Sequence, residues 1–212
     1  MGPNGARDRH GRGAPGVTVR PGDGDDAPAA ARLHATRIPD GFLSFLGTGF
    51  LTRLYRRVPR TPGSFLLVAD DEGTVVGFLA GAVDVGSLYR SFAVHDGLAA
   101  GMAAAPRLLR GWRRAVETLR HGSGGPGTGV GVELLAIAVE PGHEGQGVGT
   151  SLVAAFLERV SATGGRQAYV VVGADNDAAI GLYRRSGFVA GPAFELHAGT
   201  RSVLMQWDGS SR

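Results

Sequence analysis

The sequence predicts a single α/β domain, and three observations support this. The chain has 212 residues, of which 43% are hydrophobic, and this is enough to bury one core. Predicted strands and helices alternate along it, beginning with strand, helix, helix, strand, strand. In "VEPGHEGQGVGTSLVAAF", residues 139–156, a buried strand runs into a glycine-rich turn that opens a helix.

The composition excludes several kinds of chemistry. All 22 basic side chains are arginine, because the chain has no lysine, and it also has no cysteine. A lysine nucleophile, a disulfide, thiolate catalysis and cysteine-ligated zinc are therefore excluded. The six histidines show no metal-ligand spacing, so we predict no metal site. The net charge of +3 permits anionic ligands, but the arginines are spread along the chain, which predicts no nucleic-acid partner.

The start of the chain is not expected to fold. Residues 1–16 are polar and rich in glycine and arginine, and they lack the apolar stretch of a signal peptide, so we expect a disordered segment. Glycine or charge interrupts every apolar stretch before the length of about 18 residues that a membrane span needs. We therefore predict no membrane span, and a cytoplasmic protein fits these features.

The first half of the chain predicts five elements. Residues 17–20 form a short strand, and an alanine-rich helix follows the turn "PGDGDD". Over residues 42–58 apolar side chains recur at spacings of three and four, which predicts one helix ended by Pro59. Residues 64–84 predict a hairpin around the turn "DDEG".

The second half begins with a long helical section at about 88–120. Its arginines fall mostly away from its apolar stripe, and they form either a solvated face or a phosphate-contacting surface. The loop "HGSGGPGTG" ends it. The remaining pattern predicts a buried strand at 131–140, a helix from Val148, a strand at 167–173, a helix at 176–187 and two final strands at 188–196 and 200–207.

The glycine-rich turn predicts an anion site. The first amides of a helix have no intrahelical partner, and glycines at 145, 147 and 149 let a diphosphate approach the backbone. An ordinary tight loop is the simpler interpretation of the turn alone. A Walker A loop is excluded because it requires lysine, and a dinucleotide fold is excluded because no third glycine stands in register after Gly149.

A family resemblance extends this interpretation. The stretch "LLAIAVEPGHEGQGVGTSLV" resembles the acetyl-CoA-binding motif of the GNAT N-acetyltransferases, Q/R-x-x-G-x-G/A, with Glu144 at the position of the usual Arg or Gln. The stretch "DNDAAIGLYRRSGFV" resembles the second motif of that family. The resemblance implies a mixed, mostly antiparallel sheet flanked by helices and splayed at the acetyl-CoA site, in one GNAT domain over residues 17–208 with a helical insertion at about 88–120.

The resemblance also implies a set of cofactor-binding residues. They lie in the strand before the turn, in the turn itself and in the second motif. They are Ile137, Ala138, Val139, Glu144, Gly145, Gln146, Gly147, Val148, Gly149, Thr150, Asn176 and Tyr183. In the family a bulge in the strand aligns the thioester, and the resemblance assigns it to residues 137–139. Tyr183 would donate a proton to the leaving sulfur, although an aromatic side chain packed on the sheet is the simpler interpretation.

Glu133 is the candidate general base. An isolated acid in an apolar strand should have a raised pKa, which suits removal of a proton from an amine. Strand alternation predicts that Glu133 shares a face with Leu135 and Ile137. Glu133 also lies near the start of the strand, where it would be a solvated bystander. Glu195 and His197 are secondary candidates for substrate contact, and Arg184 and Arg185 lie either at the cofactor's 3′-phosphate or on a solvated face.

Together these features predict an acetyl-CoA-dependent N-acetyltransferase that acetylates a small-molecule amine by direct attack in a ternary complex. We expect the acceptor between the helix around 41–47, the section at 88–131 and the final hairpin. A catalytically silent acyl-CoA sensor or partner subunit and a protein N-acetyltransferase are the alternatives. The sequence leaves open which amine is the acceptor and whether the chain forms a homodimer.

Overall fold

The computed structural model describes residues 16–39, 41–121, 131–197 and 200–209. All but Gly16 of the segment at 1–16 that was expected to be disordered, and most of the glycine-rich loop at 121–129, lie outside these ranges. In chain order the elements are β1 (Val17–Gly22), α1 (Ala27–Arg37), α2 (Phe42–Leu46), α3 (Thr48–Arg57), η1 (Val58–Arg60), β2 (Ser64–Asp71), β3 (Thr74–Ala82), α4 (Val85–His121), β4 (Val132–Val139), α5 (Val148–Ala162), β5 (Gln167–Gly173), α6 (Asp177–Arg185), β6 (Val189–His197) and β7 (Thr200–Asp208).

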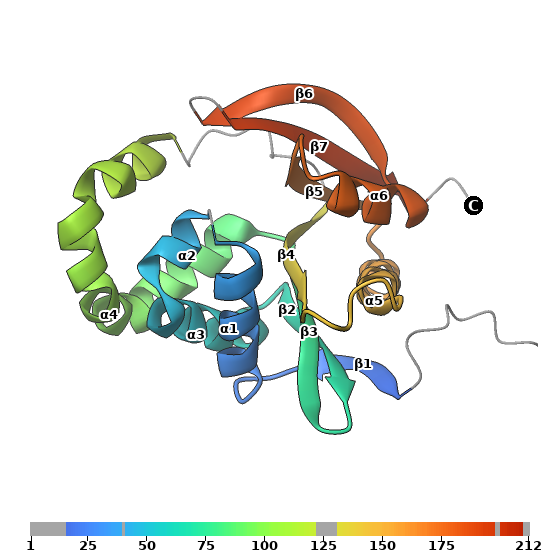
Figure 1. The fold of residues 1–212 in the computed structure, drawn as a ribbon, viewed down its shortest axis with the longest axis horizontal. Coiled ribbons are helices and arrows are strands. Elements are labelled where there is room, and N and C mark those ends of the chain that lie inside the picture. Colours follow the sequence, from blue (N-terminus) through green and yellow to red (C-terminus); the bar gives the residue numbers. More distant parts are fainter. Residues whose placement is uncertain (1–15, 40, 122–130, 198–199, 210–212) are drawn as a thin grey trace, which may run out of the picture.

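The described strands form one sheet in the order β1-β2-β3-β4-β5-β7-β6. The pair β4–β5 is parallel and the other neighbouring pairs are antiparallel, which confirms the mixed, mostly antiparallel sheet. Helices α1, α3 and α4 lie on one side of the sheet and α5 on the other (Figure 1). No helix in the described part of the chain combines the length and apolar character needed to cross a bilayer.

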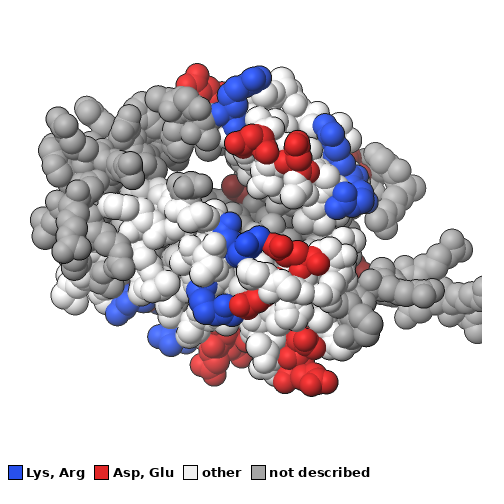
Figure 2. Space-filling view, viewed as in Figure 1, with Lys and Arg blue, Asp and Glu red and all other residues white. Residues whose placement is uncertain are grey.

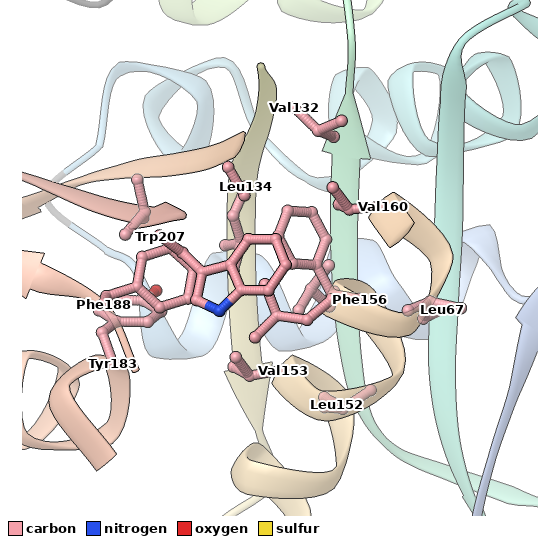
Figure 3. Close-up of a cluster of buried hydrophobic side chains, with 14 of the residues drawn as sticks. Leu67, Val132, Leu134, Leu152, Val153, Phe156, Val160, Tyr183, Phe188 and Trp207 are labelled. Atoms are coloured by element: carbon pink, nitrogen blue, oxygen red, sulfur yellow. The ribbon is translucent and has the colours of Figure 1, made fainter. Parts of the chain in front are cut away.

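Two buried clusters hold these layers together. The larger joins α5 to strands on both sides of the β4–β5 boundary, and Phe156, Leu152 and Val160 of α5 are almost fully buried in it. On the α6 side of this cluster the rings of Tyr183 and Phe188 pack together, and Trp207 belongs to the same cluster (Figure 3). The second cluster lies on the opposite face, among α1, α3, β2 and β3. Because α5 contacts both halves of the sheet, it stabilises their relative position.

The prediction of one helix over residues 42–58 is wrong, because the structure has two helices there. Gly47 adopts φ 91° and ψ 168°, which ends α2 and starts α3. A glycine tolerates this conformation, and its backbone change interrupts the run of helical hydrogen bonds. The apolar spacing continues across the break, so periodicity alone does not reveal it. Pro59 then lies in the short 3₁₀ turn η1 rather than just after the helix.

The other predicted elements are present with small boundary differences. The hairpin is β2–β3, and Glu72 in its turn has φ 49°, as tight hairpin turns require. The long helical section is α4, and the side chains of its arginines after residue 105 lie outside the described set. The limits of the single domain, 17–208, and the interpretation of 88–120 as an insertion stay predictions.

A buried histidine on α1 makes the stability of this layer depend on pH. His34 is 4% exposed, and its Nδ1 lies 2.5 Å from the Tyr55 hydroxyl of α3. Burial lowers the pKa of His34 from 6.5 to about 4. The folded chain therefore keeps this ring neutral at a pH where the unfolded chain protonates it, so stability is present above pH 6.5 and declines as the pH falls towards 4.

We predict that the variant His34→Gln reduces this pH dependence. For the two pKa values of His34, 6.5 and about 4, the free energy of unfolding should fall by about 2 kcal/mol between pH 7.5 and pH 5 in the unmodified chain. The variant should lack that part of the decrease, because glutamine does not titrate. Urea unfolding of both proteins at the two pH values measures the difference, and an equal decrease in both would contradict the prediction.

Candidate functional site

The site begins where the sheet opens between β4 and β5. These strands pair only at Val132 with Ala168 and at Glu133 with Tyr169. β4 continues to pair with β3 as far as Val139, so after Glu133 its other edge runs on without β5 beside it. Figure 2 shows this face of the molecule hollowed between the part that carries β6, β7 and α6 and the part that carries α1 to α3. The splayed sheet expected from the sequence is therefore present.

A β-bulge in β4 corrects the predicted faces of this strand. Ala80 pairs with Ala136 but the next residue, Gly81, pairs with Leu134, so Leu135 is an extra residue in β4. The extra residue shifts the alternation of side chains between the two faces of the sheet. Leu135 therefore packs against the cluster beside α1 and α3, whereas Ile137 packs against the cluster beside α5.

Glu133 and Ile137 consequently do not share a face, contrary to the prediction. Glu133 pairs with Ala82, which belongs to the cluster beside α1 and α3. The register irregularity is at Leu135, just before the segment 137–139 that the family resemblance assigned to the bulge.

The glycine-rich turn presents free backbone amides at the start of α5. Gly147 is the N-cap with φ 86°, and no side chain among the described residues caps the helix. The first backbone bond into α5 runs from Ser151 N to Gly147 O, at 2.9 Å, so the amides of residues 148–150 precede it. Gly145 also has a left-handed φ of 71°. This geometry is that of an anion site at a helix N-terminus.

The side chains of the turn point to contacts within the protein. Gln146 donates from Nε2 to the Gly142 carbonyl at 2.6 Å, and Thr150 is exposed. The Glu144 carboxylate accepts a hydrogen bond from Arg37 at the end of α1. His143 lies 3.3 Å from Asp71 of the β2–β3 hairpin. An ion pair therefore offsets the negative charge of Glu144 beside the anion site.

Val148 and Gly149 join the turn to the core. Val148 is 1% exposed and belongs to the cluster beside α5. A Cβ on Gly149 would lie 3.4 Å from Leu182 of α6 and 3.9 Å from Val139 of β4. The start of α5 thus lies against both sides of the opening in the sheet.

The second motif forms the N-terminus of α6 and the helix itself. Asn176 is the N-cap, and its Oδ1 accepts a hydrogen bond from Ala179 N at 3.1 Å. This cap uses the amide oxygen and leaves the exposed Nδ2 group to donate to a ligand. Arg184 and Arg185 are exposed. Glu195 is exposed in β6, and the side chain of His197 lies outside the described set.

Tyr183 is buried between α6 and the sheet. It is 3% exposed, and its ring lies 5.6 Å from that of Phe188, at an angle of 55°. Burial raises the pKa of its hydroxyl well above the usual value, so the group stays protonated near neutral pH. The packed ring agrees with the simpler interpretation offered by the sequence, and the role of the hydroxyl as an acid stays a prediction.

Glu133 interacts with two tyrosines that sequence reasoning missed. The Tyr169 hydroxyl donates to Glu133 Oε2 at 2.9 Å, and Tyr89 of α4 interacts electrostatically with the same carboxylate. Desolvation raises the pKa of Glu133, and the hydrogen bond from Tyr169 opposes that rise. Glu133 is half-buried and is the last residue of β4 that pairs with β5. Only its register with Tyr169 could have revealed this pair, and the register is not readable from the sequence.

Comparison with known proteins identifies the family. A family model described as the acetyltransferase (GNAT) family matches residues 37–188, which include both glycine-containing motifs. The chain belongs to the GNAT acetyltransferase family. This confirms the predicted acyltransferase class, with acetyl-CoA as the cofactor of the family.

Solved GNAT structures share the fold. The Salmonella typhimurium protein yncA, solved with its cofactor acetyl-CoA, has a TM-score of 0.60 at 18% identity, covering 93% of this chain and 96% of that one. An N-acetyltransferase from Staphylococcus aureus Mu50 has a TM-score of 0.60 at 14% identity, covering 91% and 98%. At such identities the likeness supports the fold.

Two curated relatives have more similar sequences over a short stretch. The mycothiol acetyltransferase of Streptosporangium roseum is 40% identical over 68 residues, which is 32% of this chain and 20% of that protein. The enzyme of Cellulomonas flavigena is 38% identical over 77 residues, 36% of this chain and 22% of that protein. The match therefore spans about a fifth of each relative's length.

The residues present fit coenzyme A. The uncapped N-terminus of α5 with its left-handed glycines suits a diphosphate, and the edge of β4 beyond Glu133 leaves backbone groups for the extended arm of the cofactor.

We predict that Gly147→Ala weakens coenzyme A binding at least tenfold. Alanine at φ 86° is strained by about 1–2 kcal/mol and its methyl group stands beside the free amides. Isothermal titration calorimetry with coenzyme A measures the loss. Gly164→Ala is the matched control, because Gly164 has a similar φ of 78°, has open space around it and follows the far end of α5. Equal weakening in both variants would contradict a local role for Gly147.

Proposed function

We propose that this GNAT enzyme transfers the acetyl group of acetyl-CoA to a primary amine of a small molecule, by direct attack in a ternary complex. The observation that supports this most is the presence of three groups in β4, α5 and α6, the elements that adjoin the opening between β4 and β5. They are the uncapped N-terminus of α5, the half-buried carboxylate of Glu133 and the buried hydroxyl of Tyr183. Each suits one need of acyl transfer to an amine.

Acetyl-CoA supplies the acetyl group as a thioester. The amides at the start of α5 would bind the diphosphate, with the turn residues 144–147 shaping the loop around it. Residues 137–139 and the Nδ2 group of Asn176 would bind the arm of the cofactor. The Leu135 bulge turns the backbone just before residues 137–139, which suits alignment of backbone donors towards the thioester carbonyl.

Glu133 would serve as the general base. The acceptor amine must lose a proton to become nucleophilic, and a carboxylate with a raised pKa accepts that proton, directly or through water. Tyr169 would be a positioning residue, because its hydrogen bond orients the carboxylate and stabilises its charged form. The nitrogen then forms a C–N bond to the carbonyl carbon as the C–S bond breaks.

Tyr183 would donate a proton to the departing sulfur. Burial keeps the phenol protonated, so its hydroxyl can donate when the thiolate forms, and the products are an amide and a free thiol. Tyr183 belongs to the cluster beside α5 and Glu133 faces the α4 side, so acid and base would act from opposite faces of the sheet.

The acceptor would enter between α2, α4 and the β6–β7 hairpin. α4 contacts β6, and these elements surround the opening on the side away from α5 (Figure 1). A small-molecule acceptor agrees with the names of the two curated relatives, which are mycothiol acetyltransferases. The cytoplasmic location stays a prediction.

We predict that Tyr183→Phe lowers kcat about 100-fold and leaves the affinity for coenzyme A unchanged, because it removes only a general acid and keeps the ring in the core. The release of free thiol measures kcat with a panel of small primary amines and of peptides that have a free N-terminus. Calorimetry measures the affinity for coenzyme A. An unchanged kcat would exclude the acid role. Coenzyme A binding without turnover of any amine would favour the silent sensor, and turnover of peptides alone would favour a protein N-acetyltransferase.

We predict that Glu133→Gln lowers kcat/KM about 100-fold, whereas Glu158→Gln, which removes an exposed acid from α5, has no effect. A decisive readout is the acidic limb of the pH–rate profile. Tyr169→Phe removes the hydrogen bond that lowers the pKa of Glu133, so this limb should move to higher pH. If Glu133 takes no part in proton transfer, the acidic limb should reflect only ionisation of the acceptor amine, and Tyr169→Phe should not move it.

A further inference from the structure

The glycine-rich turn contains two carboxylates and no arginine. Between the end of β4 and the start of α5 the ionisable side chains are Glu140, His143 and Glu144. Two acids near a diphosphate would repel it, since like charges a few ångströms apart interact strongly at a partly desolvated surface. An anion site of this composition therefore needs a cation from elsewhere in the fold.

Helix α1 brings two arginines to this turn. Arg32 binds both oxygens of Glu140, each at 2.7 Å, and Arg37 donates from Nη2 to Glu144 Oε1. These contacts join residues more than one hundred positions apart in the sequence. Figure 2 shows basic and acidic side chains in neighbouring pairs over α1 and the adjoining rim of the hollow.

The two arginines differ in the freedom of their donors. Arg32 is engaged on a carboxylate by both terminal nitrogens, whereas Arg37 makes its contact with Glu144 through Nη2 alone. A guanidinium carries five N–H donors, so Arg37 retains donors for a second anion. Its side chain is 37% exposed and its partner stands three residues before the N-cap Gly147.

We propose that Arg37 is a further cofactor-binding residue, which Glu144 holds at the mouth of the anion site so that its remaining N–H groups bind a phosphate oxygen of coenzyme A. In this arrangement Glu144 orients a cation instead of facing the diphosphate. The inference rests on the proposed binding of coenzyme A at the turn. A tether between α1 and the turn, without contact to the cofactor, is the alternative.

Calorimetry with coenzyme A tests the proposal on the full chain. Arg37→Gln should weaken binding about tenfold, and Arg37→Lys should recover part of the loss because it restores the charge. Arg90→Gln is the matched control, since it removes the same charge from an exposed ion pair with Asp84 at the start of α4. Glu144→Gln should weaken binding less than Arg37→Gln does, because glutamine still offers Arg37 an acceptor oxygen and the charge of Arg37 remains.

A second ligand separates phosphate contact from a loss of loop structure. Pantetheine, which lacks the phosphates, should bind Arg37→Gln and the unmodified chain with equal affinity. Thermal unfolding without ligand checks that the variants are folded. If Arg37→Gln binds coenzyme A as tightly as the unmodified chain does, or loses pantetheine to the same extent as coenzyme A, the proposal is overturned. If the unmodified chain binds no coenzyme A, the proposed function itself fails.

Discussion

The early end of the parallel pairing between β4 and β5 is the constraint on which the rest of the structure depends. A buried strand normally satisfies its backbone groups on both edges. β4 does so with β3 along its length, but pairs with β5 at two residues only. The remaining edge needs polar partners that are not a strand, and the arm of coenzyme A, an extended chain with amide groups, would supply them in the proposed function. The sheet is therefore built with a slot, and α5 holds the two halves together beside it through its apolar face.

The bulge at Leu135 gives the two sides of this slot different chemistry. Without it, Glu133 and Ile137 would share a face; with it, Glu133 faces α4 and Ile137 faces α5. On the α4 side the Glu133 carboxylate accepts a hydrogen bond from Tyr169, and burial and the charge of this carboxylate raise the pKa of Tyr89. On the α5 side lies the apolar cluster that contains Tyr183. One extra residue thus places Glu133 and Ile137 on opposite faces of the sheet.

The sequence predicts the kinds of elements well, because glycine, proline and polar turns bound them clearly. The break at Gly47 is not predictable from apolar spacing, since Phe42 to Val58 keep one helical stripe through it. The bulge in β4 is not predictable either. Nearly all residues of this strand are apolar, so a shift of the side chains from one face to the other leaves the apolar pattern unchanged. Tyr89 and Tyr169 look like ordinary core aromatics until the strand register sets Tyr169 beside Glu133. Local pattern carries no information about such long-range pairs.

Because local sequence does not reveal long-range pairs, it also does not show that Glu144 has a basic partner in the fold. Read locally, a carboxylate three residues before an anion-binding N-cap is a repulsive charge; the ion pair with Arg37 changes its surroundings. Exposed ion pairs of this kind contribute at most about 1 kcal/mol each to stability. Their main effect here is to hold α1 against the glycine-rich turn. Through Arg32 and Arg37, α1 is fixed to the turn at two points, and α1 leads directly towards α2 on the acceptor side. In the proposed function, one short helix would therefore connect the phosphate end of the site to the wall against which the acceptor would bind.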